Sequence, residues 1–312
     1  MIKRTLYFEN PAYLSLRLGQ LVVRRPEDPA LREDDDALTE DTLVKTIPIE
    51  DIGMIVLDNR QITLTQGLMA VLMENNCAVV TCGNNHLPSG LMLPLCGNTI
   101  QNERFRAQID APVPLKKQLW RQTIQAKIHN QSAVLRHTTG VDHGNMLAWE
   151  RQVKSGDTDN LEGRAAAYYW KTLFPDNPDF LRGQFEDAPN NLLNYGYAIL
   201  RAIIARALVG SGLLPTLGIH HHNRYNAYCL ADDIMEPYRP YVDKLVYDLL
   251  ASGHQAELTK EVKVQLLSLP TMEVSMNGRR SPLMLAAAQT TASLVKCFSR
   301  EIRKMVYPEV SV

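Results

Sequence analysis

Three short segments carry the residues of this chain that could do chemistry. They are Glu162–Ala166, His220–Asn223 and Asp232–Pro237, and they fall within about seventy-five residues of one another. Together they supply carboxylates and imidazoles in helix-like surroundings, without paired cysteines. Carboxylate oxygens with one histidine suit a hard divalent cation such as Mg²⁺ or Mn²⁺, as used by enzymes that act on phosphodiesters. The spacing therefore suggests a metal site.

The acidic residues each have a structural alternative. Asp233 and Glu236 are three positions apart, which places both on one face of a helix, and Asp232 can share that face. Neighbouring like charges destabilise a helix unless a cation neutralises them, and Arg239 could do so. Glu162 opens a predicted helix, where the helix dipole alone would favour it. A metal held by Glu162, Glu236 and Asp233 is the functional alternative.

The three consecutive histidines precede the acidic segment in a predicted loop. In an extended chain His221 points away from His220 and His222, so only one side of the triplet can meet the carboxylates. Spacing alone does not decide which histidine is the ligand.

Composition indicates a soluble globular protein of one or two domains. The chain has 312 residues, of which 45% are hydrophobic and 21% charged. The N-terminus resembles a strand, not a signal peptide, and the apolar stretch 198–210 is too short to cross a membrane. Five cysteines without C-x-x-C spacing indicate free thiols in a reducing compartment. We expect a cytoplasmic protein without a membrane partner.

Charge permits a nucleic-acid partner. The formal net charge is −1, but residues 27–41 hold eight acids and one base, which we expect to form a solvated loop. Residues 101–130 hold six bases and two acids. Local basic surface, and not net charge, decides whether phosphates can bind.

Periodicity predicts an α+β chain, with a small N-terminal β-rich domain followed by a larger all-α domain, which holds the candidate catalytic residues. The predicted boundaries are 1–96 for the first, 97–111 for a linker and 112–312 for the second. The layers are expected to be segregated, without a βαβ-wound sheet. Helices are predicted over 66–75, 115–135, 161–173, 190–209, 231–251, 257–267 and 282–306, and 138–160 is expected to be a loop.

Four strings in this order resemble the CRISPR-associated integrase family, the DNA-joining subunit of spacer acquisition. They are LEGRAAA at 161–167, PNNLLNYGY at 189–197, HHNRYN at 221–226 and DIMEPYRP at 233–240. The second string is the most specific. The run 221–243 is most similar to members from type II systems, which work beside one large RNA-guided nuclease.

The resemblance implies roles for individual residues. It selects His221 from the triplet, with Glu162 and Glu236 as the catalytic metal ligands, whereas Asp233 matches an acidic position that is a ligand only in some members. The bound ion would be Mg²⁺ or Mn²⁺. Candidates for phosphate contacts are Arg164, Arg201, Arg206 and Arg239, which could equally pair with nearby acids.

The resemblance also implies a reaction and partners. The 3′-hydroxyl of a captured DNA duplex would attack a repeat phosphodiester, without a nucleotide energy source. This agrees with the missing P-loop motif. The expected assembly is a homodimer, two copies of which flank a dimer of a small companion protein. Double-stranded DNA is the substrate, and the large effector nuclease is a further expected partner.

Two alternatives remain open from the sequence. A transposon-type integrase shares the catalytic domain but would be expected to carry an additional DNA-binding domain. A non-catalytic scaffold would bind nucleic acid through the basic stretch 101–130, and its acidic residues would be structural.

Overall fold

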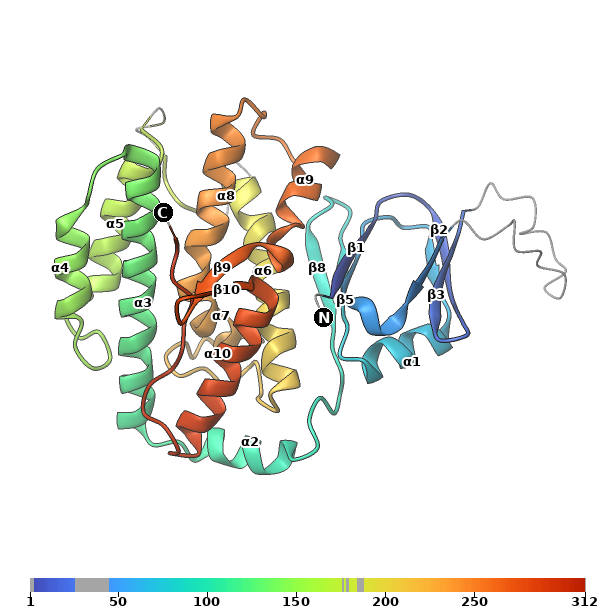
Figure 1. Cartoon of the computed structure of the whole chain (residues 1–312), viewed down its shortest axis with the longest axis horizontal. Helices are drawn as coiled ribbons and strands as arrows, with labels where there is room; N and C mark the ends of the chain where they lie inside the picture. Colours follow the sequence, from blue (N-terminus) through green and yellow to red (C-terminus); the bar gives the residue numbers. More distant parts are fainter. Residues whose placement is uncertain (1–2, 26–44, 176, 178–179, 184–187, 312) are drawn as a thin grey trace, which may run out of the picture. The chain divides into compact units, whose positions relative to one another are not determined.

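The computed structural model describes residues 3–25, 45–175, 177, 180–183 and 188–311 (Figure 1). The acidic segment 27–41 therefore lies outside the described residues. The chain divides into two compact units, Met1–Gly97 and Asn98–Val312. The predicted linker 97–111 contains a helix, α2 (Gln101–Ile109), which packs against α10 (Leu283–Phe298) within the second unit.

The first unit contains two four-stranded sheets. Their strand orders are β1-β5-β7-β8 and β4-β3-β2-β6. A hairpin joins β2 to β3, and both Leu18 and Gly19 have positive φ, as tight hairpin turns require. The strands are β1 (Arg4–Phe8), β2 (Ala12–Arg17), β3 (Gln20–Arg24), β4 (Lys45–Pro48), β5 (Ile52–Leu57), β6 (Ile62–Leu64), β7 (Ala78–Cys82) and β8 (Pro88–Met92).

The first sheet differs from the expected arrangement because β1, β5 and β7 run parallel. The connection from β5 to β7 passes through β6 and helix α1 (Gln66–Glu74), so this unit contains one crossover of the kind that the sequence argument excluded. Burial explains the difference: β5 is buried at five successive residues, as parallel strands covered on both faces are.

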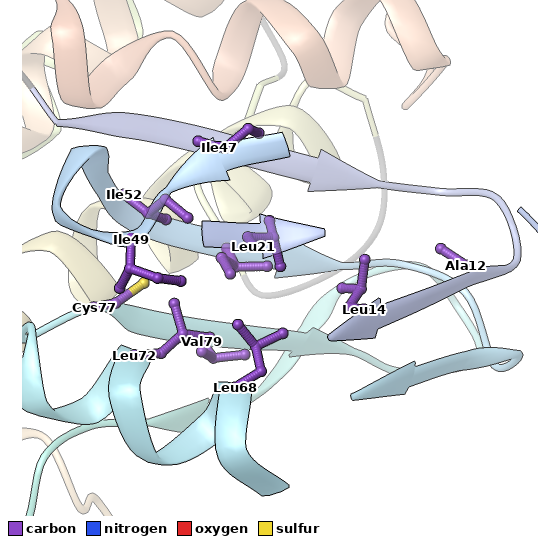
Figure 2. Packing of buried hydrophobic residues seen from close by; sticks show 11 residues of the cluster. Ala12, Leu14, Leu21, Ile47, Ile49, Ile52, Leu68, Leu72, Cys77 and Val79 are labelled. Carbon is purple, nitrogen blue, oxygen red and sulfur yellow. The ribbon is translucent and has the colours of Figure 1, made fainter. Parts of the chain in front are cut away.

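One apolar cluster fills this unit (Figure 2). It joins side chains from both sheets, among them Leu14 and Ile52, to Leu68 and Leu72 on α1. Leu68 and Leu72 are four residues apart and so share one helix face. Thr65 caps α1 by accepting a hydrogen bond from the backbone N–H of Leu68.

The second unit is mainly helical, so the chain is α+β with an N-terminal β region, but this unit is not all-α. A two-stranded hairpin, β9 (Glu273–Met276) and β10 (Arg279–Pro282), turns at Asn277-Gly278 with positive φ at both residues. The other helices are α3 (Val113–Thr139), α4 (Gly144–Gln152), α5 (Leu161–Leu173), α6 (Asn190–Gly210), α7 (Cys229–Met235), α8 (Arg239–Ala251) and α9 (Lys260–Leu266).

Helix α6 forms the core of this unit. It is long and apolar enough to cross a membrane by length and composition, but 78% of its apolar window is buried within the protein, as expected for the core helix of a soluble fold. It packs against α8 at Gly196, where a Cβ atom would come within 2.5 Å of Val242 Cγ1. Only glycine allows this close approach.

Three helical predictions differ from the structure. The expected loop 138–160 contains α4, whose Met146 is buried as the helix packs on α3 and α5. The helix expected to reach residue 306 ends at Phe298, and Arg300 then takes a left-handed φ of 61°. The segment 231–251 is divided by a 3-10 turn, η4 (Glu236–Tyr238), because Pro237 and Pro240 cannot donate backbone hydrogen bonds.

Candidate metal and DNA site

Glu162 is held at the first turn of α5 by two capping side chains. Asp157 accepts hydrogen bonds from the backbone N–H groups of Leu161 and Glu162, at 3.0 and 2.9 Å. Asn160, in a left-handed conformation, accepts one from Gly163. A Cβ atom at Gly163 would lie 2.8 Å from the Asn160 side chain. The small residue after Glu162 therefore allows the cap that fixes the start of the helix.

Glu236 lies where α7 gives way to η4, and its side chain is only 6% exposed. Its Oε1 accepts a hydrogen bond from Arg239 Nε at 2.9 Å. Its buried Oε2 pairs with the ammonium of Lys127 at 2.6 Å. Burial opposes its ionisation, but Arg239 and Lys127 outweigh burial and lower the pKa of Glu236 to about 2.

Lys127 of α3 brings the two glutamates together. Its Nζ lies 2.7 Å from Glu162 Oε1 as well as 2.6 Å from Glu236 Oε2. Burial disfavours the charged ammonium, yet the attraction of Glu236 and Glu162 raises the pKa of Lys127. The sequence argument did not identify this residue, because a lysine within a long helix carries no signal of a buried partner.

His221 is oriented by Asp233. The fully buried Asp233 contacts the Nδ1 of His221 at 2.5 Å and accepts backbone hydrogen bonds from Ile219, His220 and His221. This contact and the nearby Glu236 and Glu162 charges raise the pKa of His221 despite its partial burial. Its Nε2 is the ring nitrogen left available for a ligand, which is the arrangement by which carboxylates orient metal-binding histidines.

Gly218 makes the Asp233 contact possible. A Cβ atom at this residue would lie 2.4 Å from the carbonyl oxygen of His221 and 2.8 Å from Asp233 Oδ2. The preceding loop is fixed by Gln108, whose side chain pairs with the backbone of Leu214 and Leu217. The carboxylate of Asp233 thus points to the histidine loop, and that of Glu236 points to Lys127, although the two residues are only three positions apart.

The other two histidines lie outside this arrangement. The ring of His220 stacks on Trp120, with centroids 4.1 Å apart and an interplanar angle of 2°. Burial and the neighbouring His221 lower the pKa of His220. His222 is exposed.

The four predicted phosphate-contacting arginines have different surroundings. Arg201 forms a two-pronged pair with Asp232, at 2.7 and 3.1 Å. Arg206 is buried in α6. Arg164 is exposed beside the ring of Trp149 and has no carboxylate partner among the described residues. Arg239 bonds to Glu236 through Nε and lies over the ring of Tyr197.

A cavity of about 300 Å³ adjoins Glu236. Lys127, Arg182 and Arg239 give it three positive charges, and Gln131 and Asp243 also line it. The terminal nitrogens of Arg239 donate no hydrogen bond to any described residue. Charge and volume suit a phosphate group better than an apolar ligand.

The donor set can be tested against a divalent cation. Across residues 3–25, 45–175, 177, 180–183 and 188–311, no three His, Cys, Asp or Glu side chains lie close enough together to hold a metal ion. Glu162 and Glu236 nevertheless meet at one cation, the ammonium of Lys127, and the His221 ring is held nearby by Asp233. Two carboxylates that converge on one stand-in cation fit a hard divalent ion.

The chain is similar to known proteins over most of its length. A family model described as "CRISPR associated protein Cas1" matches residues 6–268. A CRISPR-associated endonuclease Cas1 from Neisseria meningitidis is 33% identical over 99% of this chain and 97% of its own length.

Solved structures show the same fold. A casposase bound to its integration product superposes with a TM-score of 0.76 at 22% identity, covering 98% of this chain and 92% of that one. A Cas6-RT-Cas1–Cas2 complex gives a TM-score of 0.73 at 18% identity, over 99% of this chain and 36% of that one.

The family match and the Neisseria relative place this chain in the nuclease and integrase class. More particularly, the chain belongs to the Cas1 family of CRISPR adaptation proteins.

Proposed function

We propose that this protein is a metal-dependent DNA endonuclease and integrase that inserts short DNA duplexes into a CRISPR repeat array. The observation that carries the proposal is the meeting of Glu162 and Glu236 at a single cation position, beside a cavity lined by three basic side chains. The names of the relatives support the same chemistry, because they include CRISPR-associated endonucleases and a casposase with an integration product.

Each residue has a defined role in this proposal. Glu162, Glu236 and the Nε2 of His221 would hold Mg²⁺ or Mn²⁺. Asp233, which the sequence argument offered as a ligand, instead positions His221, since it is fully buried and holds the His221 ring and loop. Arg239 keeps Glu236 ionised and offers its terminal nitrogens to a phosphate oxygen.

The reaction is a phosphodiester exchange. The 3′-hydroxyl oxygen of the captured strand bonds to the repeat phosphorus as the bond from phosphorus to the leaving 3′-oxygen breaks, and the proton lost by the attacker balances the one gained by the leaving group. A divalent ion, when bound, would supply charge stabilisation at the phosphate and favour loss of the hydroxyl proton. Arg239 and Lys127 add positive charge on the cavity side of the same phosphate.

Partners follow from the relatives. The Cas6-RT-Cas1–Cas2 complex contains a Cas2 component, and we propose that this chain likewise assembles with a small companion protein on double-stranded DNA. The β-rich unit is the proposed dimerisation domain. Light scattering of the chain alone and with its companion would test both assemblies.

Three alanine variants test the activity itself. Integration of a labelled duplex into a supercoiled repeat plasmid should fall at least 10³-fold in Glu162→Ala, His221→Ala and Glu236→Ala. Binding to the duplex should stay within about threefold of the unaltered protein, because the basic surface remains. Lys244→Met is the matched control, since Lys244 pairs with Asp248 and neither residue lines the cavity.

The result also separates the alternatives. Full integration activity in all three alanine variants would exclude the metal site. No integration by the unaltered protein, together with intact DNA binding, would favour the non-catalytic scaffold.

A further inference from the structure

Lys127 occupies the place that the proposed function gives to a divalent ion. Its ammonium contacts one oxygen of Glu162 and one of Glu236, at 2.7 and 2.6 Å. A divalent ion bound by these oxygens would lie about 2.0–2.2 Å from each of them. The ammonium and the ion therefore cannot both sit between the two carboxylates.

The position of Lys127 allows its ammonium to leave without moving the backbone. The residue belongs to α3, a helix of 27 residues, and only its flexible four-carbon stem reaches the glutamates. Its side chain also lines the cavity of about 300 Å³ beside Glu236. A rotation about the stem would carry the charge from the carboxylates into this cavity.

The cavity contains an acceptor for the displaced ammonium. Gln131 follows Lys127 by four residues, so both lie on one face of α3, and both line the cavity. Gln131 is buried, and its Oε1 has no hydrogen-bond partner among the described residues. An unpaired buried amide oxygen is costly and gains from any donor that reaches it.

The same cavity discourages the move while no anion is present. As the Lys127 ammonium leaves the two glutamates it loses their attraction and is repelled by Arg182 and Arg239, while Asp243 on the same lining is already bonded to Tyr169 and Tyr197. A DNA phosphate in the cavity would reverse that repulsion and give the ammonium, Arg182 and Arg239 a common partner.

We propose that Lys127 is an internal competitor of the divalent ion, displaced toward Gln131 when metal and DNA bind together. This inference rests on the proposed metal-dependent function. Lys127 keeps Glu162 and Glu236 together before metal arrives and weakens metal binding to the DNA-free protein. Because metal and phosphate both favour the displaced position, each raises the affinity for the other.

Metal affinity, and not activity, provides the test. Mn²⁺ is titrated into the full-length protein without DNA, followed by calorimetry and by the electron paramagnetic resonance signal of free Mn²⁺. Lys127→Met, which keeps the length of the side chain without its charge, should bind Mn²⁺ at least tenfold more tightly than the unaltered protein. Lys127→Arg should remain weak, and the control Lys244→Met should not change.

If Lys127 had only a structural role, Lys127→Met would bind Mn²⁺ more weakly, because loss of the lysine would disorder the ligands. Lys127→Gln provides a second neutral variant if Lys127→Met does not fold. Adding a duplex that ends in 3′-dideoxynucleotides, which binds without reacting, should tighten Mn²⁺ binding at least tenfold in the unaltered protein and clearly less in Lys127→Met.

The outcomes for the two proposals are distinguishable. If Mn²⁺ binding with DNA is abolished by Glu236→Gln, yet the neutral Lys127 variants bind no more tightly than the unaltered protein, the competitor role is overturned and the metal site stands. If no Mn²⁺ binding sensitive to Glu236→Gln is found even with DNA, the metal site fails, and the role of Lys127 fails with it.

Discussion

Two buried carboxylates line the same cavity, and their pKa values are shifted in opposite directions. Glu236 lies beside Lys127 and Arg239, which lower its pKa to about 2. Asp243 is held by the hydroxyl groups of Tyr169 and Tyr197, and burial raises its pKa to about 7. Burial acts in the same direction on both residues, so the difference comes from the neighbours. At Asp243 the tyrosine hydrogen bonds and the charges of Arg182 and Arg239 only partly offset burial, whereas at Glu236 the direct ion pairs with Lys127 and Arg239 outweigh it.

The largest expected effect comes from making Glu236 neutral. Glu236→Gln leaves Lys127 and Arg239 buried without their shared carboxylate, which should cost about 3–5 kcal/mol of unfolding free energy at pH 7. Because the folded pKa is depressed, this stabilisation is present above about pH 4.5 and is lost as pH falls toward 2. Urea unfolding at pH 7 and pH 3 measures it. An equal loss at both pH values would contradict the ion-pair explanation.

Asp243→Asn makes the same chemical change, but the contribution of this carboxyl to stability changes with pH in the opposite direction. The folded pKa of Asp243 lies above its ordinary value, so its contribution is fully present below about pH 4 and is lost as pH rises through 7. Relative to the unaltered protein, the variant should gain on the order of 3 kcal/mol between pH 4.5 and pH 8. Urea unfolding of both proteins at these two pH values gives the difference. A difference that does not change with pH would mean that Asp243 is ionised throughout.

Asp233 is a third buried carboxylate, and its substitution would measure how much the orientation of the His221 ring contributes to integration. Asp233→Asn keeps the shape of the side chain but weakens the hold on the His221 ring, so integration should fall about 10–100-fold, as for other residues that orient metal ligands. Kinetics over a range of Mn²⁺ concentrations should place much of this loss in metal affinity. A loss as complete as that of Glu236→Ala would instead make Asp233 a ligand.

The smallest effects are expected at the surface, where the same contrast holds between paired and unpaired charges. Arg164 has no carboxylate partner among the described residues, whereas Arg201 pairs with Asp232. Arg164→Ala should weaken DNA binding and reduce the slope of its salt dependence by about 1. Arg201→Ala should change that slope little. Fluorescence anisotropy at several salt concentrations measures both, and equal slopes for the two variants would remove the distinction.

Much of the secondary structure of the helical unit could be predicted, because apolar periodicity is a property of neighbouring residues in the sequence. The helices over 161–173 and 190–210 follow from apolar periodicity, and α5 begins exactly where the period begins. The hairpin β9–β10 was missed even though Asn277-Gly278 is a strong turn signal. Helix α4 could not be predicted in this way, since it is stabilised by packing on α3 and α5 across a polar sequence.

The sequence by itself determined the kinds of donor in the candidate site and their order along the chain: Glu162, then His221, Asp233 and Glu236. Only the tertiary structure decided their directions. Asp233 turns to the histidine loop because Gly218 leaves room for its carboxylate, and Glu236 turns to Lys127 because the helix tightens at Pro237. Lys127 comes from a helix about 35 residues before Glu162, and long-range burial of that kind leaves no trace in local spacing.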